Sequence, residues 1–210
     1  MGPVLLVNPN GSEATTAAMV AIAEGTLNSV QGWTNTAAPE MLTSPEPLEA
    51  SARDIVRLEI PEGTAGVIIA AFGDPGLAAL AARAQCPVVG IGASAARAAA
   101  KGGARFAVAT TTPLLGPSID ALMRQEGGEG SYLGSFMTMG DPQALVQDMT
   151  ALDAALIGAC RAAATAGAER IIIGGGPLAQ AAQRIGVHVS VPLIQPLPEA
   201  CRALLRDQSL

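Results

Sequence analysis

The sequence predicts an α/β protein built on parallel sheets, and two observations carry this prediction. Short apolar runs rich in Val, Ile and Leu recur along the chain, and Ala-rich runs of helical length separate them. Strands that read as continuous apolar runs are typical of parallel sheets whose two faces are covered by helices. The chain has 210 residues, half of them apolar and only 2% aromatic, so aliphatic side chains must fill a sizeable core.

The runs predict strands and helices in alternating order. The clearest strands are expected at Val4–Val7, Val67–Ala70, Val88–Ile91, Phe106–Ala109, Ile171–Ile173 and Val191–Ile194. Weaker strands are expected near Thr34–Ala37 and Tyr132–Phe136. The longer helices are expected at Ser12–Leu27, Pro47–Glu59, Ala93–Lys101, Pro113–Gln125 and Pro142–Ala166.

The chain also looks internally repeated. GVIIAAFGDPGLAALAARAQCPVVGIG in the first half is similar to ERIIIGGGPLAQAAQRIGVHVSVPLIQP in the second, and VLLVNPN is similar to FAVATTT. The matches lie at offsets of 104, 105 and 102 residues, and they pair Ala71 with Gly175, Pro87 with Pro192, and Asn8 with Thr110. Three matches at nearly one offset indicate two related halves.

Two related α/β halves predict two pseudo-symmetric lobes that face each other across a cleft. We place the first lobe at residues 1–98 plus 190–210 and the second at residues 99–189. Ligands of open parallel sheets bind beyond the carboxyl ends of the strands. We therefore expect the site in the cleft, where the loops 8–12, 72–76, 110–113 and 174–177 meet.

The composition of the chain indicates which kinds of partner and which cellular compartment to expect. Charged residues make up 14% of the chain, the formal net charge is −6, and no basic run is present. We therefore expect no nucleic-acid partner and no binding to membranes. No apolar run approaches the roughly 20 residues of a membrane span, and the start lacks the basic flank of a signal peptide, which predicts a cytoplasmic protein. One histidine and three scattered cysteines indicate neither a metal site nor a disulfide framework.

Each of the four loops ends a strand and opens a helix, where free backbone N–H groups favour an anion or a polarised carbonyl. The loops contain no Lys or Arg, and the chain has no GxxxxGK[ST] motif. This predicts a small carboxylate or imide as ligand rather than a triphosphate. The expected binding residues are Asn8, Ser12, Phe72, Gly73, Thr110, Thr112, Gly175 and Gly176.

Several of these residues also have a structural explanation. Ser12 and Thr112 are suited to cap the helices that follow them. Asp74 stands directly before Pro-Gly and is typical of a turn at this position, and the glycines at 174–176 permit tight turns. The functional interpretation is favoured because all four loops lie at one end of the predicted sheets.

The segments VNPNGS, IIAAFGDPGL, CPVVGIG, FAVATTT, IIIGGGPLA and VPLIQP follow one another along nearly the whole chain. In this order they resemble the Asp/Glu/hydantoin racemase superfamily, and they are most similar to its hydantoin and allantoin racemase branch. The resemblance implies two pseudo-symmetric lobes with the site between them, a homo-oligomer, a small-molecule substrate and proton transfer without a cofactor.

The resemblance also implies two catalytic cysteines, one from each lobe, on opposite faces of the substrate carbon. The matching positions in this chain are Ala71 and Gly175, so both thiols are absent. Cys86, Cys160 and Cys201 lie away from the loops and are expected to be small buried apolar residues.

The remaining polar groups predict a family enzyme with an altered mechanism. Asp74 is a candidate base if burial raises its pKa, Thr111 a candidate to polarise a carbonyl, and Gln195 a candidate to orient a water or an amide. Lyase, hydrolase or decarboxylase chemistry on a small carboxylate or hydantoin-like compound suits these groups. A hydantoin or amino-acid racemase that uses Asp74 as a substitute base is an alternative, and so is a non-catalytic protein that binds a small ligand.

Overall fold

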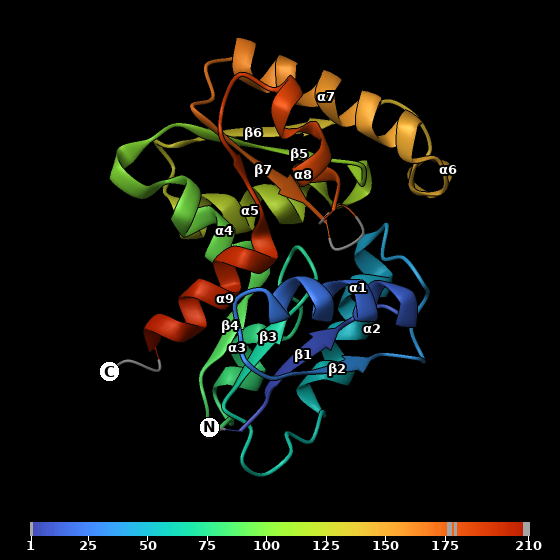
Figure 1. Ribbon diagram of the computed structural model, residues 1–210, viewed down its shortest axis with the longest axis vertical. Coiled ribbons are helices and arrows are strands. Elements are labelled where there is room, and N and C mark those ends of the chain that lie inside the picture. Colours follow the sequence, from blue (N-terminus) through green and yellow to red (C-terminus); the bar gives the residue numbers. More distant parts are fainter. Residues whose placement is uncertain (1, 176–177, 179, 208–210) are drawn as a thin grey trace.

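Two four-stranded parallel sheets form the framework of the protein, as the sequence predicted. The computed structural model describes residues 2–175, 178 and 180–207 (Figure 1). The first sheet has the order β2-β1-β3-β4 and comprises β1 (Val4–Asn8), β2 (Val30–Thr34), β3 (Gly66–Ile69) and β4 (Val88–Gly90). The second has the order β6-β5-β7-β8 and comprises β5 (Phe106–Thr110), β6 (Tyr132–Met137), β7 (Arg170–Gly174) and β8 (Leu193–Ile194). The two orders correspond strand by strand, as an internal repeat requires.

Helices cover both faces of each sheet. In chain order they are α1 (Glu13–Glu24), α2 (Pro45–Val56), α3 (Leu77–Ala81), α4 (Ile91–Ala99), α5 (Gly116–Gly127), α6 (Pro142–Gln147), α7 (Met149–Thr165), α8 (Ala181–Ile185) and α9 (Pro196–Asp207). Three short 3-10 turns follow α4, β5 and α8, namely η1 (Lys101–Gly103), η2 (Pro113–Leu115) and η4 (Gly186–His188). Each helix among the described residues is too short or too polar to span a membrane.

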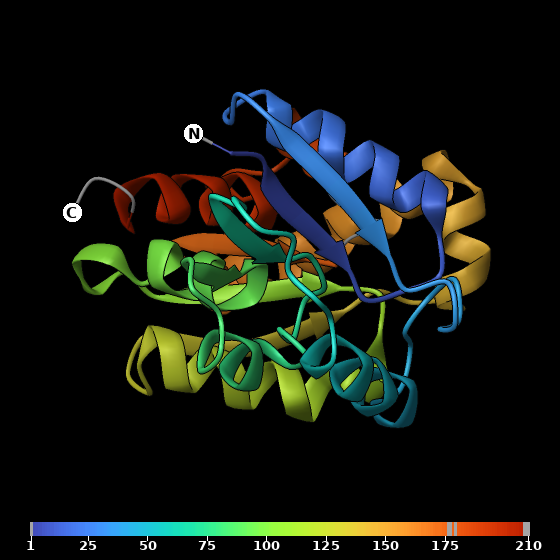
Figure 2. The same ribbon diagram turned by 90° about the horizontal axis from the view of Figure 1, so that it is seen from below.

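Alternate side chains of each central strand enter opposite cores. In β1, Leu6 packs with α1 and α9, whereas Leu5 and Val7 pack with α2 and α3. Figure 2 shows α1 and α2 on opposite sides of the first sheet. In β5, Ala107 packs with α7 and α8, whereas Phe106 packs with α4 and α5. This alternation is the period of two that a strand buried on both faces requires.

Several predicted elements have different bounds; the last strand, for example, is Leu193–Ile194 rather than Val191–Ile194. The second strand is Val30–Thr34 rather than Thr34–Ala37, because the N–H of Asn35 donates to the carbonyl of Asn8 and the chain turns there. The helix expected from Pro113 begins at Gly116 after a 3-10 turn. Pro117 has no N–H to donate to the Pro113 carbonyl, so it suits the first turn of a helix instead.

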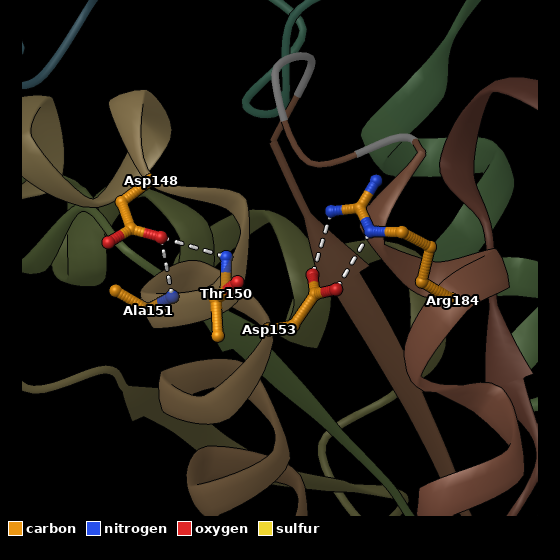
Figure 3. A network of polar contacts seen from close by, with 5 residues as sticks. All are labelled: Asp148, Thr150, Ala151, Asp153 and Arg184. Atoms are coloured by element: carbon orange, nitrogen blue, oxygen red, sulfur yellow. Dashed lines mark hydrogen bonds and ion pairs between the residues drawn. The ribbon is translucent and has the colours of Figure 1, made fainter.

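The helix expected over residues 142–166 is divided at Asp148. Asp148 has extended backbone angles, and its carboxylate accepts hydrogen bonds from the N–H groups of Thr150 and Ala151 at 2.9 and 3.0 Å, so it caps α7 (Figure 3). An Asp side chain that competes for these N–H groups favours a new helix start over continuation. Further along α7, Asp153 forms two 2.7 Å hydrogen bonds with Arg184 of α8.

The chain crosses between the lobes near its end. β8 pairs with β7 in the second sheet, and α9, which follows directly, packs Cys201 and Leu204 into the core of the first lobe. Helix α4 contacts α9 as well as α5 and β7. Arg170 of β7 ties down the end of α4, because its Nη1 donates to the carbonyls of Ala98, Ala99 and Lys101 at 3.1, 2.9 and 2.8 Å.

We predict that Arg170→Met destabilises the protein by about 2 kcal/mol, because three carbonyls at the end of α4 lose a charged donor. Urea unfolding followed by circular dichroism measures this cost. Arg161→Met, at an exposed position of α7, is the matched control and should change stability by less than about 0.5 kcal/mol. Equal midpoints for the two variants would contradict the role of Arg170.

Candidate functional site

A small cavity of about 50 Å³ lies between the lobes, at the carboxyl ends of the central strands. Its lining combines small, apolar and hydroxyl side chains from both lobes: Asn10, Met41, Leu42, Ala70, Ala71, Phe72, Thr110, Thr111, Thr112, Leu115, Ile119, Gly174, Gly175 and Leu178. The volume gives room for a few water molecules. A ring-shaped ligand therefore requires side chains or lobes to move apart.

The structure brings six of the expected site positions to this cavity, namely Ala71, Phe72, Thr110, Thr111, Thr112 and Gly175. Ala71 and Gly175, which the repeat places opposite each other, both line it. Gly176 lies outside the described residues. The loops that follow β3, β5 and β7 thus meet at one site, although they are far apart in the sequence.

The three threonines of the 110–112 loop have different surroundings. The hydroxyl of Thr110 donates to the carbonyl of Gly174 at 2.8 Å and lies 3.3 Å from that of Thr112. Thr112 makes no side-chain cap bond to the turn after it, so the expected cap is wrong. Thr111 is 2% exposed, and its hydroxyl makes no hydrogen bond to another residue in the described part of the chain. Within the described part of the chain, Thr111 is thus the hydroxyl of this loop that has no partner and can bind a ligand.

Asn8 shapes the first loop from inside the core. It is fully buried, and its Nδ2 donates to Asn10 Oδ1 at 2.8 Å and to Thr16 Oγ1 at 2.9 Å, while its Oδ1 accepts from the N–H of Asn10. These bonds direct Asn10, rather than Asn8, to the cavity. Asn10 stands in the same NPNG loop but was not among the expected binding residues.

Ser12 caps α1, as expected, because its hydroxyl accepts a hydrogen bond from the N–H of Thr15 at 3.2 Å. Its side chain lines a larger groove outside the cavity, between α1 and α6. Gly73 has a φ of 122°, which side chains rarely adopt, and a Cβ there would face Leu48 of α2. These two residues therefore shape the loops around the cavity.

Asp74 holds the start of α4. Its Oδ1 accepts from the N–H of Gly92 at 2.8 Å and its Oδ2 from the N–H of Ala93 at 2.6 Å. Its backbone is left-handed, with φ of 50°, a conformation that Asp tolerates better than most residues. A Cβ on Gly90 would lie 2.2 Å from the Asp74 Cγ, so the glycine makes room for this carboxylate.

Asp74 is 7% exposed; its carboxylate faces α4, and the residue also lines a surface hollow beside α2. Burial raises its pKa to about 6, against the opposing effect of the two N–H donors. A carboxylate with this pKa suits proton transfer, but both of its oxygens are occupied by α4. The geometry favours the structural explanation of Asp74.

Gln195 lies on the other side of Gly175 from the cavity. Together with Ile91, Ile173 and Gly175 it lines a separate hollow of about 10 Å³. A glycine at position 175 thus separates the cavity from the Gln195 amide. The φ of Gly175 is 141°, a backbone conformation that disfavours any side chain at this position.

The three cysteines lie outside the cavity lining. Cys160 in α7 and Cys201 in α9 are buried in the cores of the two lobes, where burial raises the pKa of each thiol to about 11. Cys86 is half-buried before β4 and lines a surface hollow with Ile60 and Glu62, and burial raises its pKa too. Among the described residues, no three His, Cys, Asp or Glu side chains cluster as metal ligands do.

We predict that the stability difference between wild type and Asp74→Asn depends on pH. Because the pKa of Asp74 is higher in the folded protein than the ordinary 3.8, its contribution to stability is complete below pH 3.8 and lost as pH rises through 6. The advantage of wild type over the variant should therefore fall by about 2 kcal/mol between pH 4 and pH 7. Thermal or urea unfolding of both proteins across this range measures it, and a constant difference would contradict a raised pKa.

Comparison with known proteins agrees with the fold. The family model described as Asp/Glu/Hydantoin racemase matches residues 4–204. The chain is 28% identical to the hydantoin racemase of Paenarthrobacter aurescens, over 95% of this chain and 88% of that protein. It is 30% identical to the hydantoin racemase of Rhizobium meliloti, over 94% of this chain and 85% of that protein.

Solved structures show the same architecture. The allantoin racemase from Klebsiella pneumoniae superposes with a TM-score of 0.84 at 26% identity, covering 98% of this chain and 87% of that chain. The allantoin racemase from Pseudomonas fluorescens superposes with a TM-score of 0.88 at 22% identity, covering 98% and 91%. With the two-lobed fold, the cavity between the lobes and a family match over nearly its whole length, the chain belongs to the Asp/Glu/hydantoin racemase family.

Proposed function

We propose that this protein is an enzyme that acts on a small carboxylate or hydantoin-like compound by cofactor-independent chemistry without cysteine. The observation that carries the proposal is the cavity between the lobes, where Ala71 and Gly175 line the wall and hydroxyl groups supply the polar contacts. The family match supports an enzyme, and the three cysteines lie elsewhere.

The lining of the cavity supports a hydantoin-like ring as the substrate. Among its described residues are three threonines and Asn10, and none is charged. A hydantoin ring presents neutral carbonyl and N–H groups, which hydroxyl and amide side chains can match without a buried charge. The relatives named hydantoin racemase point to the same class of ring.

The chemistry proposed for the cavity is polarisation of a carbonyl. Thr111 donates a hydrogen bond to a carbonyl oxygen of the substrate, since its hydroxyl has no other partner in the described part. Gln195 lines the separate hollow beyond Gly175, so it can orient a water or an amide of the substrate only if its side chain turns into the cavity. Hydrolysis, elimination or decarboxylation can proceed from a polarised carbonyl, whereas two-base racemisation needs an acid and a base on opposite faces.

A second candidate is a racemase that uses Asp74 as its base. The names of the relatives and the pKa of about 6 favour it. The two backbone donors at the start of α4 weigh against it, because the carboxylate must leave them to reach the cavity.

A third candidate is a binding protein without catalysis. The absence of acids and bases from the described cavity lining favours it. Such a protein raises its melting temperature with ligand, by mass action, and forms no product.

We predict that the protein converts at least one member of a ligand panel in D2O into a new compound. The panel holds hydantoins, allantoin, Asp, Glu and substituted malonates, and proton NMR follows each compound with and without protein. New product signals are expected because the described cavity lining offers hydroxyl groups to polarise a carbonyl but no acid–base pair to exchange the α-proton.

The other outcomes separate the candidates. Loss of the α-proton signal without a new product means racemisation, and Asp74→Asn then tests whether Asp74 is the base. A silent panel, together with a raised melting temperature for one compound, indicates a binding protein for that class and contradicts the enzyme proposal.

We predict that turnover survives the loss of accessible thiols. Cys86 is the partly exposed cysteine, and it lies at a surface hollow away from the cavity, so Cys86→Ser should retain the wild-type rate within about twofold. Iodoacetamide should have equally little effect on the native protein, since Cys160 and Cys201 are buried. A rate that iodoacetamide abolishes would show that a thiol takes part.

A further inference from the structure

A groove of about 490 Å³ runs along the boundary between the lobes, outside the cavity. We call it the α1–α6 groove; its lining includes Glu40, Met41, Gln143 and Gln147. Figure 1 shows α1 and α6 on the same side of the molecule, one from each lobe. A ligand in this groove touches both lobes at once.

Met41 separates the groove from the cavity. Met41 lines both spaces, and among the described residues no other is shared by the two linings. A methionine side chain has three rotatable bonds and adapts easily to a new neighbour. A ring that occupies the cavity can therefore extend a substituent into the groove when Met41 changes its rotamer.

The groove offers uncharged hydrogen-bonding groups. Gln143 and Gln147 are four residues apart on α6, so they lie on one face of the helix, and both line the groove. Their amides make no hydrogen bond to another residue that the structure describes. Each amide can both donate and accept, so two such side chains match a substituent that does the same.

The groove also disfavours a negative charge. Glu40 is the charged residue among the described residues of its lining, and no Lys or Arg is among them. A carboxylate on the ligand would lie near a like charge without a cationic partner. A neutral amide of the same shape meets no such repulsion.

We propose that the α1–α6 groove is the subsite for the substituent of the ring and that it selects uncharged, hydrogen-bonding substituents over carboxylates. The inference rests on the proposed function, which places a hydantoin-like ring in the cavity. It deepens that function by specifying which rings bind best.

Two isosteric ligands test the proposal: hydantoins with a carbamoylethyl or a carboxyethyl group on the ring carbon next to the carbonyl. Calorimetry measures their affinities and that of unsubstituted hydantoin, so that no turnover is needed. Wild type should bind the amide about tenfold more tightly than the acid. The double variant Gln143→Ala/Gln147→Ala should bind the amide about tenfold more weakly than wild type does, as expected for two lost hydrogen bonds. Its affinity for unsubstituted hydantoin should equal that of wild type. Both glutamines are exposed on a short helix, and circular dichroism checks that the variant folds.

Two further variants complete the design. Glu40→Gln should tighten binding of the acid by about threefold and leave binding of the amide unchanged, because it removes an exposed like charge. Gln125→Ala, an exposed glutamine on α5 outside the groove, is the matched control and should change none of the affinities.

The outcomes distinguish this inference from the proposed function. If unsubstituted hydantoin binds but wild type does not prefer the amide, or the double variant weakens all three ligands equally, the subsite is overturned and the ring assignment stands. If none of the three ligands binds to wild type, the hydantoin ring is the wrong occupant of the cavity and the subsite fails with it.

Discussion

The contact between the Asp74 carboxylate and the first N–H groups of α4 holds the site together. It joins the loop after β3 to the helix after β4, through two hydrogen bonds to Gly92 and Ala93. A buried carboxylate is costly, and here backbone donors at a helix N-terminus offset part of that cost. Gly90 has no side chain where the carboxylate lies, so the arrangement depends on a glycine as much as on the acid.

This contact places the residues that precede Asp74. The Phe72 ring belongs to the core of the second lobe, in one cluster with Val108, Leu115 and Ile172. Gly174 leaves room for it, since a Cβ there would lie 2.7 Å from the ring. In a chain with few aromatic residues, one ring thus anchors the boundary between the lobes. Ala71, directly before it, is thereby held at the wall of the cavity.

The chemistry of the cavity follows from what this scaffold presents. Hydroxyl and amide groups converge from both lobes, while the titratable group nearest in sequence, Asp74, is engaged by α4. Such a site binds neutral carbonyl and N–H groups more readily than charges. The α1–α6 groove also offers uncharged hydrogen-bonding side chains, the glutamines of α6, and Met41 lies between the groove and the cavity. Ring recognition and substituent recognition would then use one type of interaction.

The sequence by itself determined the architecture. Apolar runs of strand length alternate with helical runs, and this pattern depends only on residues close together in the chain. The parallel sheets, and the internal repeat that pairs Ala71 with Gly175, were therefore predictable. The loops at the strand ends followed from that order, and the structure brings Thr111 and its neighbours to the cavity. Strand ends were less predictable, as β2 shows, because long-range pairing with β1 and the turn at Asn35 set them.

Only the tertiary structure decided what each polar side chain does. The sequence suggested that Asp74 is a turn residue or a base. Its partners, the N–H groups of Gly92 and Ala93, lie 18 and 19 residues further along the chain, and no local pattern predicts them. Asn8 and Asn10 are the same residue type in one loop, yet Asn8 holds the loop through buried hydrogen bonds and Asn10 lines the cavity. Hydrogen-bond partners depend on which segments pack together in three dimensions, whereas periodicity depends only on neighbours along the chain. That is why the sequence determined the fold and the loops, and tertiary packing decided the roles within them.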